Sequence, residues 1–209
     1  MKADWTDQFD PNATSNQEFI NGEGLSVIVP FMSSDPMTWQ VIDTADAEGV
    51  VLPYADGRLA FLAAMPKAGS FDLDGTVVPR LLSTAQMSEN VKVAMPKFHS
   101  EYGAADLVPA LTELGLGVAF DPDLADFSGI APNLYISAVL HKVSMSVGEQ
   151  GTEAAAATVV VIAESGGSLE EPTIVRFNRP YLYAVVDTVT SLPLFIGWME
   201  DPSLAPPTA

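Results

Sequence analysis

The sequence contains no cysteine, and basic residues are scarce in it. The absence of cysteine excludes disulfide frameworks, thiolate nucleophiles and thiolate zinc sites. Lys and Arg total 9 against 27 Asp and Glu, which gives a formal charge of -18. Such a surface repels phosphate backbones and anionic lipid over most of its area. We therefore expect no nucleic-acid partner and no membrane partner.

Long apolar runs and catalytic signatures are absent as well. No stretch approaches the length of a membrane span, and the first residues lack the apolar core of a signal peptide. Only His99 and His141 could serve as imidazole bases, and neither lies in a catalytic signature. The Asp-rich stretches at 72–75 and 121–123 lack the remaining ligands of a calcium loop. We expect a protein that is not an enzyme and that holds no metal and no cofactor.

What the chain does contain is enough apolar residues for one globular domain, residues 1–209, with 48% hydrophobic content and no internal repeat. Short segments rich in Val, Ile and aromatics, bounded by turn formers, predict strands. These lie at residues 25–32, 39–44, 49–54, 59–65, 90–95, 134–147, 173–177, 181–187 and 192–198. Helices are predicted only at 75–87, with Pro79 in the first turn, and at 106–115. The fold class is α+β and mainly β.

Three of these strands carry a further pattern. Residues 181–186 and 194–198 are apolar on both faces, which places them at the centre of a packed sheet, and the short turn 188–191 makes their strands a hairpin. In 134–147 the odd positions 135, 139, 143, 145 and 147 are apolar, while the even positions change from apolar to polar. One face of that strand should stay buried while the other emerges into solvent.

The segment after that strand combines two conflicting propensities. Residues 152–157 favour helix and residues 158–162 are strongly strand-prone. One interpretation is a short helix capped by Thr152 that runs into a strand. The alternative is an extended strip whose one face has only small or β-branched side chains, so that it could slide between existing strands. That face consists of Thr152, Ala154, Ala156, Thr158, Val160 and Ile162. The next stretch, 163–172, is polar and has the composition of an exposed tip at which proteases cut.

Several motifs in order resemble the serpin family. The hinge of inhibitory serpins is similar to the string Glu149, Gln150, Gly151, Thr152, Glu153, Ala154, Ala155, Ala156, Ala157 and Thr158. A strand ending in a His-Lys pair is matched at 138–142, and the family signature at 175–183, where Tyr181 stands in place of the usual Phe. Further matches at 126–130, at Trp5 with the Phe-Asp pair after it, and at 197–202 extend the resemblance to nearly the whole chain.

The resemblance implies a suicide inhibitor of serine proteases whose working element is residues 149–171. The target protease would attack the loop and form a covalent acyl-enzyme, after which residues 152–162 would insert into a sheet as a new strand. Family spacing places the scissile bond after Ser165, or after Glu164 if the count slips by one, so the reactive bond lies among Glu164, Ser165 and Gly166. Because no Lys or Arg occurs between Lys142 and Arg176, we expect elastase-like, subtilisin-like or Glu-preferring targets rather than trypsin-like ones.

Two residues are assigned to the region where the sheet opens. The residue pattern alone favours a core role for both Trp5 and His141. The resemblance implies that His141 is buried and hydrogen-bonded in this region and that Trp5 lies where the loop begins to insert. The small residues 154–157 favour insertion over the alternative, a non-inhibitory serpin-like binding or interaction protein or an inactive fragment.

Serpins are about twice as long as this chain. The resemblance implies a partial fold that lacks the N-terminal helical half and the partner strand upstream of Trp5. Alone, such a chain should be unable to complete insertion, and its exposed sheet edge should favour self-association. Truncation is favoured over a fragment that pairs with its other half and over a degenerate relative with another role. The resemblance also implies an extracellular or secreted protein.

Overall fold

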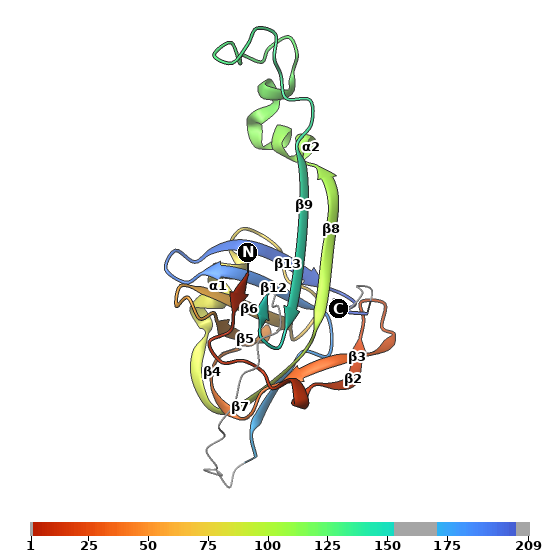
Figure 1. The fold of residues 1–209 in the computed structure, drawn as a ribbon, viewed down its shortest axis with the longest axis vertical. Helices are drawn as coiled ribbons and strands as arrows, with labels where there is room; N and C mark the ends of the chain where they lie inside the picture. The colour runs from red at the N-terminus through yellow and green to blue at the C-terminus, as the bar shows by residue number, and fades with distance from the viewer. Residues whose placement is uncertain (1, 153–170, 204–209) are drawn as a thin grey trace. The chain divides into compact units, whose positions relative to one another are not determined.

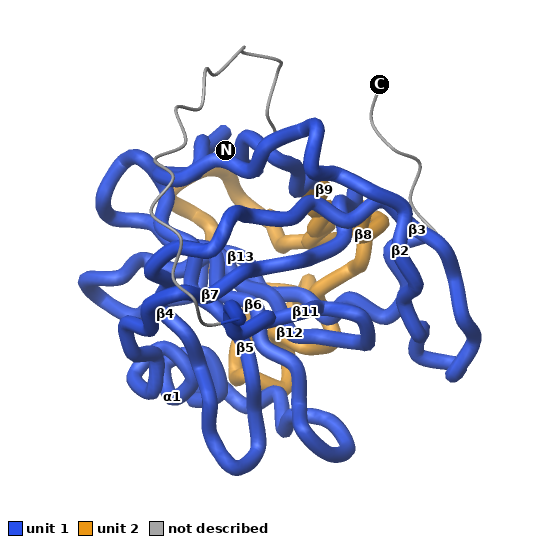
Figure 2. The backbone as a smooth tube through the Cα atoms, turned by 90° about the horizontal axis from the view of Figure 1, so that it is seen from below, with its two compact units in different colours: residues 1–99, 146–209 blue, residues 100–145 orange. Residues whose placement is uncertain are grey.

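The structure, a computed structural model, describes residues 2–152 and 171–203. They form two compact units, residues 1–99 with 146–209 and residues 100–145, each of which is taken by itself (Figure 2). The described residues are mainly β, as predicted, and the prediction of a single domain stays a prediction. None of their helices has the length and apolar content that crossing a bilayer would require.

The first unit is built on a nine-stranded sheet (Figure 1). Its strands are β2 (Ser15–Ile20), β3 (Ser26–Ser33), β4 (Met37–Asp43), β5 (Ala47–Pro53), β6 (Leu59–Pro66), β7 (Gln86–Pro96), β11 (Thr173–Arg176), β12 (Tyr181–Asp187) and β13 (Leu192–Met199). Their order is β13-β12-β6-β5-β4-β7-β3-β2, and β11 pairs with β7 in parallel. Seven of the nine strands were predicted within a few residues; β2 was not predicted, and β7 begins four residues before its predicted start.

The middle strands are buried on both faces because both of their faces are apolar. In β6, Ala60, Leu62 and Ala64 belong to the core that contains helix α1 (Val77–Thr84). Phe61 points to the opposite face, where its ring stacks on that of Tyr183 from β12 with centroids 6.1 Å apart. All residues of β12 are buried, which confirms the prediction that this strand lies inside the sheet.

The prediction for β13 is half wrong. The hairpin with β12 is present, with the turn at residues 188–191. However, β13 lies at the end of the strand order, and Leu194 and Ile196 are 47% and 53% exposed. Among the described residues β12 is its only strand neighbour, and the side chains of Leu192, Leu194 and Ile196, which share one face, are exposed.

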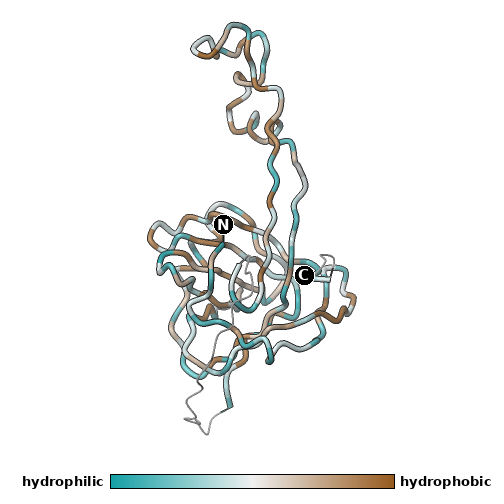
Figure 3. Tube along the Cα trace, viewed as in Figure 1, coloured by the Kyte–Doolittle hydropathy of each residue, from teal (hydrophilic) through white to brown (hydrophobic). Residues whose placement is uncertain are grey.

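The second unit contains short helical turns: α2 (Val108–Leu111), η2 (Thr112–Leu116) and η3 (Gly117–Phe120). The helical turns of α2 and η2 overlap the predicted helix at 106–115, and this helical stretch ends at Gly115, which adopts φ 95°, outside the helical region. Apolar residues are distributed through this unit (Figure 3), and Leu114 and Ile130 are both 80% exposed. The described residues therefore give this unit little core of its own.

A second, four-stranded sheet has the order β1-β10-β9-β8. Its strands are β1 (Ala3–Asp4), β10 (Gly151–Thr152), β9 (Leu140–Gly148) and β8 (Phe98–Asp106). β9 begins six residues later than predicted, and β8 was not predicted. β10 is antiparallel to both β1 and β9, so β1 and β9 run parallel to each other with β10 between them. Between β1 and β2 the chain forms one 3-10 turn, η1 (Pro11–Ala13).

The aromatic side of the core contains a hydroxyl without a partner. Tyr181 packs against the rings of Phe98, Phe177 and Tyr183, and its Oη is one of two buried side-chain polar atoms in the described residues that lack a hydrogen bond. The other is Nε1 of Trp39. A buried hydroxyl without a partner costs about 1–3 kcal/mol of desolvation.

Replacement of Tyr181 by Phe should therefore stabilise the protein. Tyr181→Phe removes only the hydroxyl that lacks a hydrogen bond. We expect the free energy of unfolding to rise by about 1 kcal/mol and the melting temperature by about 2–4 °C. Tyr183→Phe is the matched control, because the Tyr183 hydroxyl is not a buried group without a hydrogen bond. This variant should leave the free energy of unfolding nearly unchanged. A lower melting temperature for Tyr181→Phe in calorimetry would contradict this account.

Candidate functional site

The site is the turn that joins β9 to β10, together with β1 on its other side. Gly151 and Thr152 pair with Asp4 and Ala3 on one side and with Gly148 and Val147 on the other. Two further backbone bonds hold the turn itself: the Trp5 N–H donates to the Gln150 carbonyl at 2.8 Å, and the Phe9 N–H donates to the Glu149 carbonyl at 2.9 Å. Gly151 and Thr152 of the predicted hinge therefore already lie inside a sheet.

Gly151 is required at its position by close backbone approach. A Cβ atom there would lie 2.1 Å from the Ala3 carbonyl oxygen and 2.7 Å from the Asp4 Cα. Both atoms belong to the backbone of the neighbouring strand and cannot rotate away. Only glycine lets β1 come close enough to pair with β10.

Thr152 is buried and hydrogen-bonded. Its side chain is 3% exposed, and its Oγ1 lies 2.5 Å from the hydroxyl oxygen of Tyr54. Burial raises the pKa of Tyr54 above its usual range, and the hydrogen bond to Thr152 only partly offsets this. The phenol therefore stays protonated, and the two hydroxyls form a neutral pair beneath the hinge.

Trp5 packs under the same turn. Its indole Nε1 donates to the Gly148 carbonyl at 2.8 Å, and its ring stacks on Tyr54 at 4.7 Å between centroids. Phe61 approaches the indole edge-to-face at 5.7 Å. An indole N–H bonded to the last residue of β9 fixes the point at which the chain turns back.

Glu149 ties the turn to two distant segments. Its carboxylate accepts from the Thr14 hydroxyl at 2.7 Å and pairs with the Lys97 ammonium at 2.9 Å. Burial alone would raise the pKa of this carboxyl, but the Lys97 and Thr14 hydrogen bonds outweigh it, so the pKa lies below the usual 4.5. The Glu149 side chain is 12% exposed. Among the ion-paired carboxylates of the described residues, only Asp187 is less exposed.

The structure brings Trp5 together with residues 149–152 but gives His141 a different environment. His141 lies in the part of β9 that belongs to the second unit, and it is exposed, so the expectation of a buried histidine is wrong for this chain. In that part of β9 the described residues supply only β8 as a neighbour, and Leu140 and Lys142 are exposed as well. The remaining hinge residues (153–158) and the reactive-bond residues Glu164, Ser165 and Gly166 lie outside the described residues.

Sequence reasoning missed three residues whose side chains contact residues 149–152: Tyr54, Lys97 and Thr14. Each is distant from residues 149–152 in the sequence and contacts them only through the fold. No motif marks them. The one available signal concerns Lys97. The chain has only nine Lys and Arg residues, and five of them form ion pairs with carboxylates in the described residues.

Comparison with known proteins identifies the family. A family profile described as "Serpin (serine protease inhibitor)" matches residues 1–202, which is nearly the whole chain. The chain belongs to the serpin family. Serpins are mostly inhibitors of proteases rather than catalytic enzymes, and a serine protease is the partner that the family implies. Within the described residues, no group of three or more His, Asp or Glu side chains is placed to hold a metal ion.

The serpin relatives extend across distant organisms. An uncharacterised serpin-like protein of Thermococcus kodakarensis is 36% identical over 97% of this chain and 48% of its own length. Human alpha-1-antichymotrypsin is 33% identical over 98% of this chain and 50% of its own length. The native thermophilic serpin tengpin superimposes with a TM-score of 0.79 at 34% identity, covering 95% of this chain and 52% of tengpin. The chain thus spans about half the length of the relatives it matches.

The close approach at Gly151 predicts a sharp difference between Gly151 in β10 and Gly148 at the end of β9. Gly151→Ala should displace β10 from β1, because the new methyl group would overlap the Ala3 backbone. Gly148→Ala is the matched control, since its Cβ would meet only the Lys97 Cε at 3.8 Å. We expect hydrogen exchange at the Trp5 amide to accelerate at least about tenfold in the first variant and little in the second. Equal exchange rates in both would refute the packing argument.

The Glu149 carboxylate should make the hinge sensitive to acid. Because its folded-state pKa is depressed, its stabilisation is fully present above the usual value of 4.5 and is lost as pH falls through the folded-state value. Glu149→Gln should lower the free energy of unfolding by about 1 kcal/mol at pH 7 and have no effect once the carboxyl is protonated. The control is Asp43→Asn, which breaks the exposed pair with Lys67 and should change stability by less than about 0.5 kcal/mol. Urea unfolding at pH 7 and pH 3 measures both.

Proposed function

We propose that this chain carries the hinge and reactive loop of an inhibitory serpin, which traps serine proteases as covalent acyl-enzymes by inserting its cleaved loop into a sheet. The observation that carries the proposal is β10, which lies between β1 and β9 and is antiparallel to both. A strand that continued from Thr152 in the same direction would enter the middle of a sheet instead of extending its edge.

The register of β10 specifies where the next residues would pair. Gly151 faces Gly148 and Thr152 faces Val147, so in an inserted strand residue 154 would face Met145, residue 156 Val143 and residue 158 His141. Directly opposed residues share a face of the sheet. Met145 and Val147 are buried and Val143 is partly buried, so the small side chains at 154 and 156 would enter the covered face. The small side chains at 154 and 156 therefore suit the covered face of the sheet next to β9.

The proposed activity requires more of the sheet than this chain supplies. β1 offers only two residues as the second neighbour of an inserted strand, whereas residues 152–162 would need a partner along their whole length. We propose that this partner belongs to the N-terminal half found in full-length serpins. An edge of β9 without its neighbour is also the surface through which self-association would occur.

For the target we propose an elastase-like or subtilisin-like serine protease. The reactive bond placed among Glu164, Ser165 and Gly166 has no basic residue before it, and trypsin-like enzymes need one. The extracellular setting that the family resemblance implies stays a prediction.

The test is covalent trapping. The 209-residue chain, alone and mixed with the first half of the Thermococcus relative, is incubated with pancreatic elastase and with trypsin and run on a denaturing gel. We expect an elastase adduct only when the complementing half is present. Adducts with trypsin alone would overturn the assigned specificity. Cleavage without any adduct and without a gain in thermal stability would favour a non-inhibitory serpin-like interaction protein.

Thr152 is the residue whose replacement should separate cleavage from trapping. Thr152→Arg would place a long charged side chain where Thr152 is buried against Tyr54, so the cut loop should fail to insert. In the complemented chain we expect covalent adduct to fall at least about tenfold while loop cleavage continues at a normal rate. Thr152→Ser keeps the hydroxyl and is the matched control. Normal trapping by the Arg variant would contradict the insertion account.

A further inference from the structure

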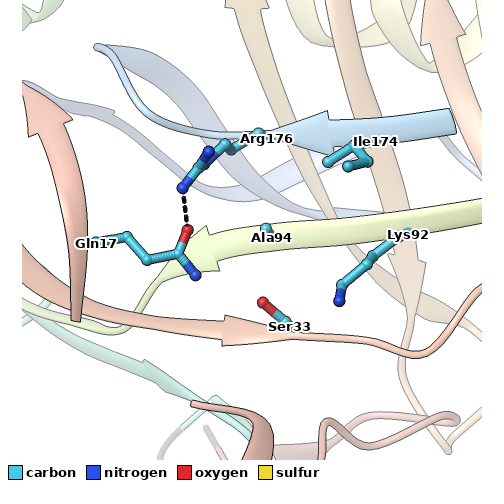
Figure 4. A pocket seen from close by; sticks show the side chains of 6 residues that line it. All are labelled: Gln17, Ser33, Lys92, Ala94, Ile174 and Arg176. Atoms are coloured by element: carbon cyan, nitrogen blue, oxygen red, sulfur yellow. Dashed lines mark hydrogen bonds between the residues drawn. The ribbon is translucent and has the colours of Figure 1, made fainter. Parts of the chain in front are cut away.

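A small cavity of about 180 Å³ lies on the nine-stranded sheet of the first unit (Figure 4). It is lined by Gln17 of β2, Ser33 of β3, Lys92 and Ala94 of β7, and Ile174 and Arg176 of β11. None of these residues belongs to the hinge site. None of them is acidic either, although the chain has a formal charge of -18. The cavity is therefore lined by basic and neutral residues in a protein that is acidic as a whole.

The pairing of the strands brings the lining residues together. On β7, Ala94 is opposite Ser33 of β3 on one side and Arg176 of β11 on the other. Lys92 lies two residues before Ala94, hence on the same face, and is paired with Ile174. Two cations, one hydroxyl and one amide thus surround a floor formed by Ala94 and Ile174.

The polar atoms of the cavity keep unused hydrogen-bonding capacity. Arg176 donates to Gln17 Oε1 and lies 6.0 Å from the centroid of the Phe31 ring, which holds its guanidinium in place while further N–H groups remain. Gln17 Nε2 donates one hydrogen to Ser15 at 3.1 Å and keeps the other. Within the described parts of the chain, neither the Ser33 hydroxyl nor the Lys92 ammonium has a partner, whereas five other basic side chains form ion pairs with carboxylates.

We propose that this cavity binds a carboxylate that carries a short aliphatic stem. The carboxylate would accept from the Arg176 guanidinium, the Lys92 ammonium and the Ser33 hydroxyl, and the stem would lie on Ala94 and Ile174. A guanidinium presents N–H groups in the geometry of a carboxylate, and the apolar floor favours a stem over a bare inorganic anion. Ligand pockets for larger molecules measure roughly 300–1,000 Å³, so this cavity takes a small acid or a single acidic side chain.

Titration of the ¹⁵N-labelled 209-residue chain with butyrate tests the proposal. We expect saturable amide shifts at Gln17, Ser33, Ala94 and Ile174 with a dissociation constant of roughly 1 mM, as suits a ligand of so few atoms. Butyramide, the neutral isostere, should not saturate. A glutamate blocked at both ends distinguishes the two sources: if it saturates, the cavity accepts an acidic side chain of a partner, and if only butyrate saturates, the ligand is a free acid.

Lys92→Gln and Arg176→Gln should each weaken butyrate binding by about tenfold. The matched controls are Lys67→Gln and Arg80→Gln, which remove the same charge from exposed ion pairs outside the cavity and should leave binding unchanged. The proposal is overturned if butyrate gives no saturable shifts, if the controls weaken binding equally, or if inorganic phosphate binds as well as butyrate. Should Arg176→Gln fail to fold, Lys92→Gln against Lys67→Gln decides alone.

Discussion

The antiparallel pairing of β10 with strands on both of its sides is the constraint on which the site depends. Two residues, Gly151 and Thr152, complete the hydrogen bonds of β1 and β9 at once. This needs a glycine where β1 comes closest and a small buried side chain at the next position. Trp5, Tyr54 and Phe61 form the aromatic support under the pairing. Gly151 and Thr152 are therefore part of a core.

The turn before β10 is held by interactions of a different kind. Glu149 is bonded to Lys97 at the end of the large sheet and to Thr14 just before β2. Burial would raise the pKa of this carboxyl, and the hydrogen bonds from these two partners outweigh that effect, so that the pKa lies below its usual value. Two segments that are far apart in the sequence thus fix this turn, and the aromatic support fixes the strand that follows it.

Sequence reasoning succeeded where a single segment contains its own signal. β5, β6 and β12 are apolar on both faces and were predicted. The hinge at 149–158 was assigned from the family resemblance, and it stays a prediction. β2 was missed because only Phe19 of its six residues is buried, so the strand has no clear alternation. The central place given to β13 and the burial given to His141 were wrong because both depend on neighbours, which a pattern within one strand does not specify. Tyr54 and Lys97 could not be found because the fold alone brings them to the hinge.

The position of Trp5 has an optical consequence. Its indole stacks on Tyr54, which bonds to Thr152, and its Nε1 bonds to Gly148, so the environment of the ring depends directly on whether β10 is paired. Trp198 packs against Phe71, away from these contacts, whereas Trp39 stacks on Phe9, whose amide donates to the Glu149 carbonyl. The intrinsic fluorescence of one natural side chain can thus follow the hinge in real time, with no attached dye.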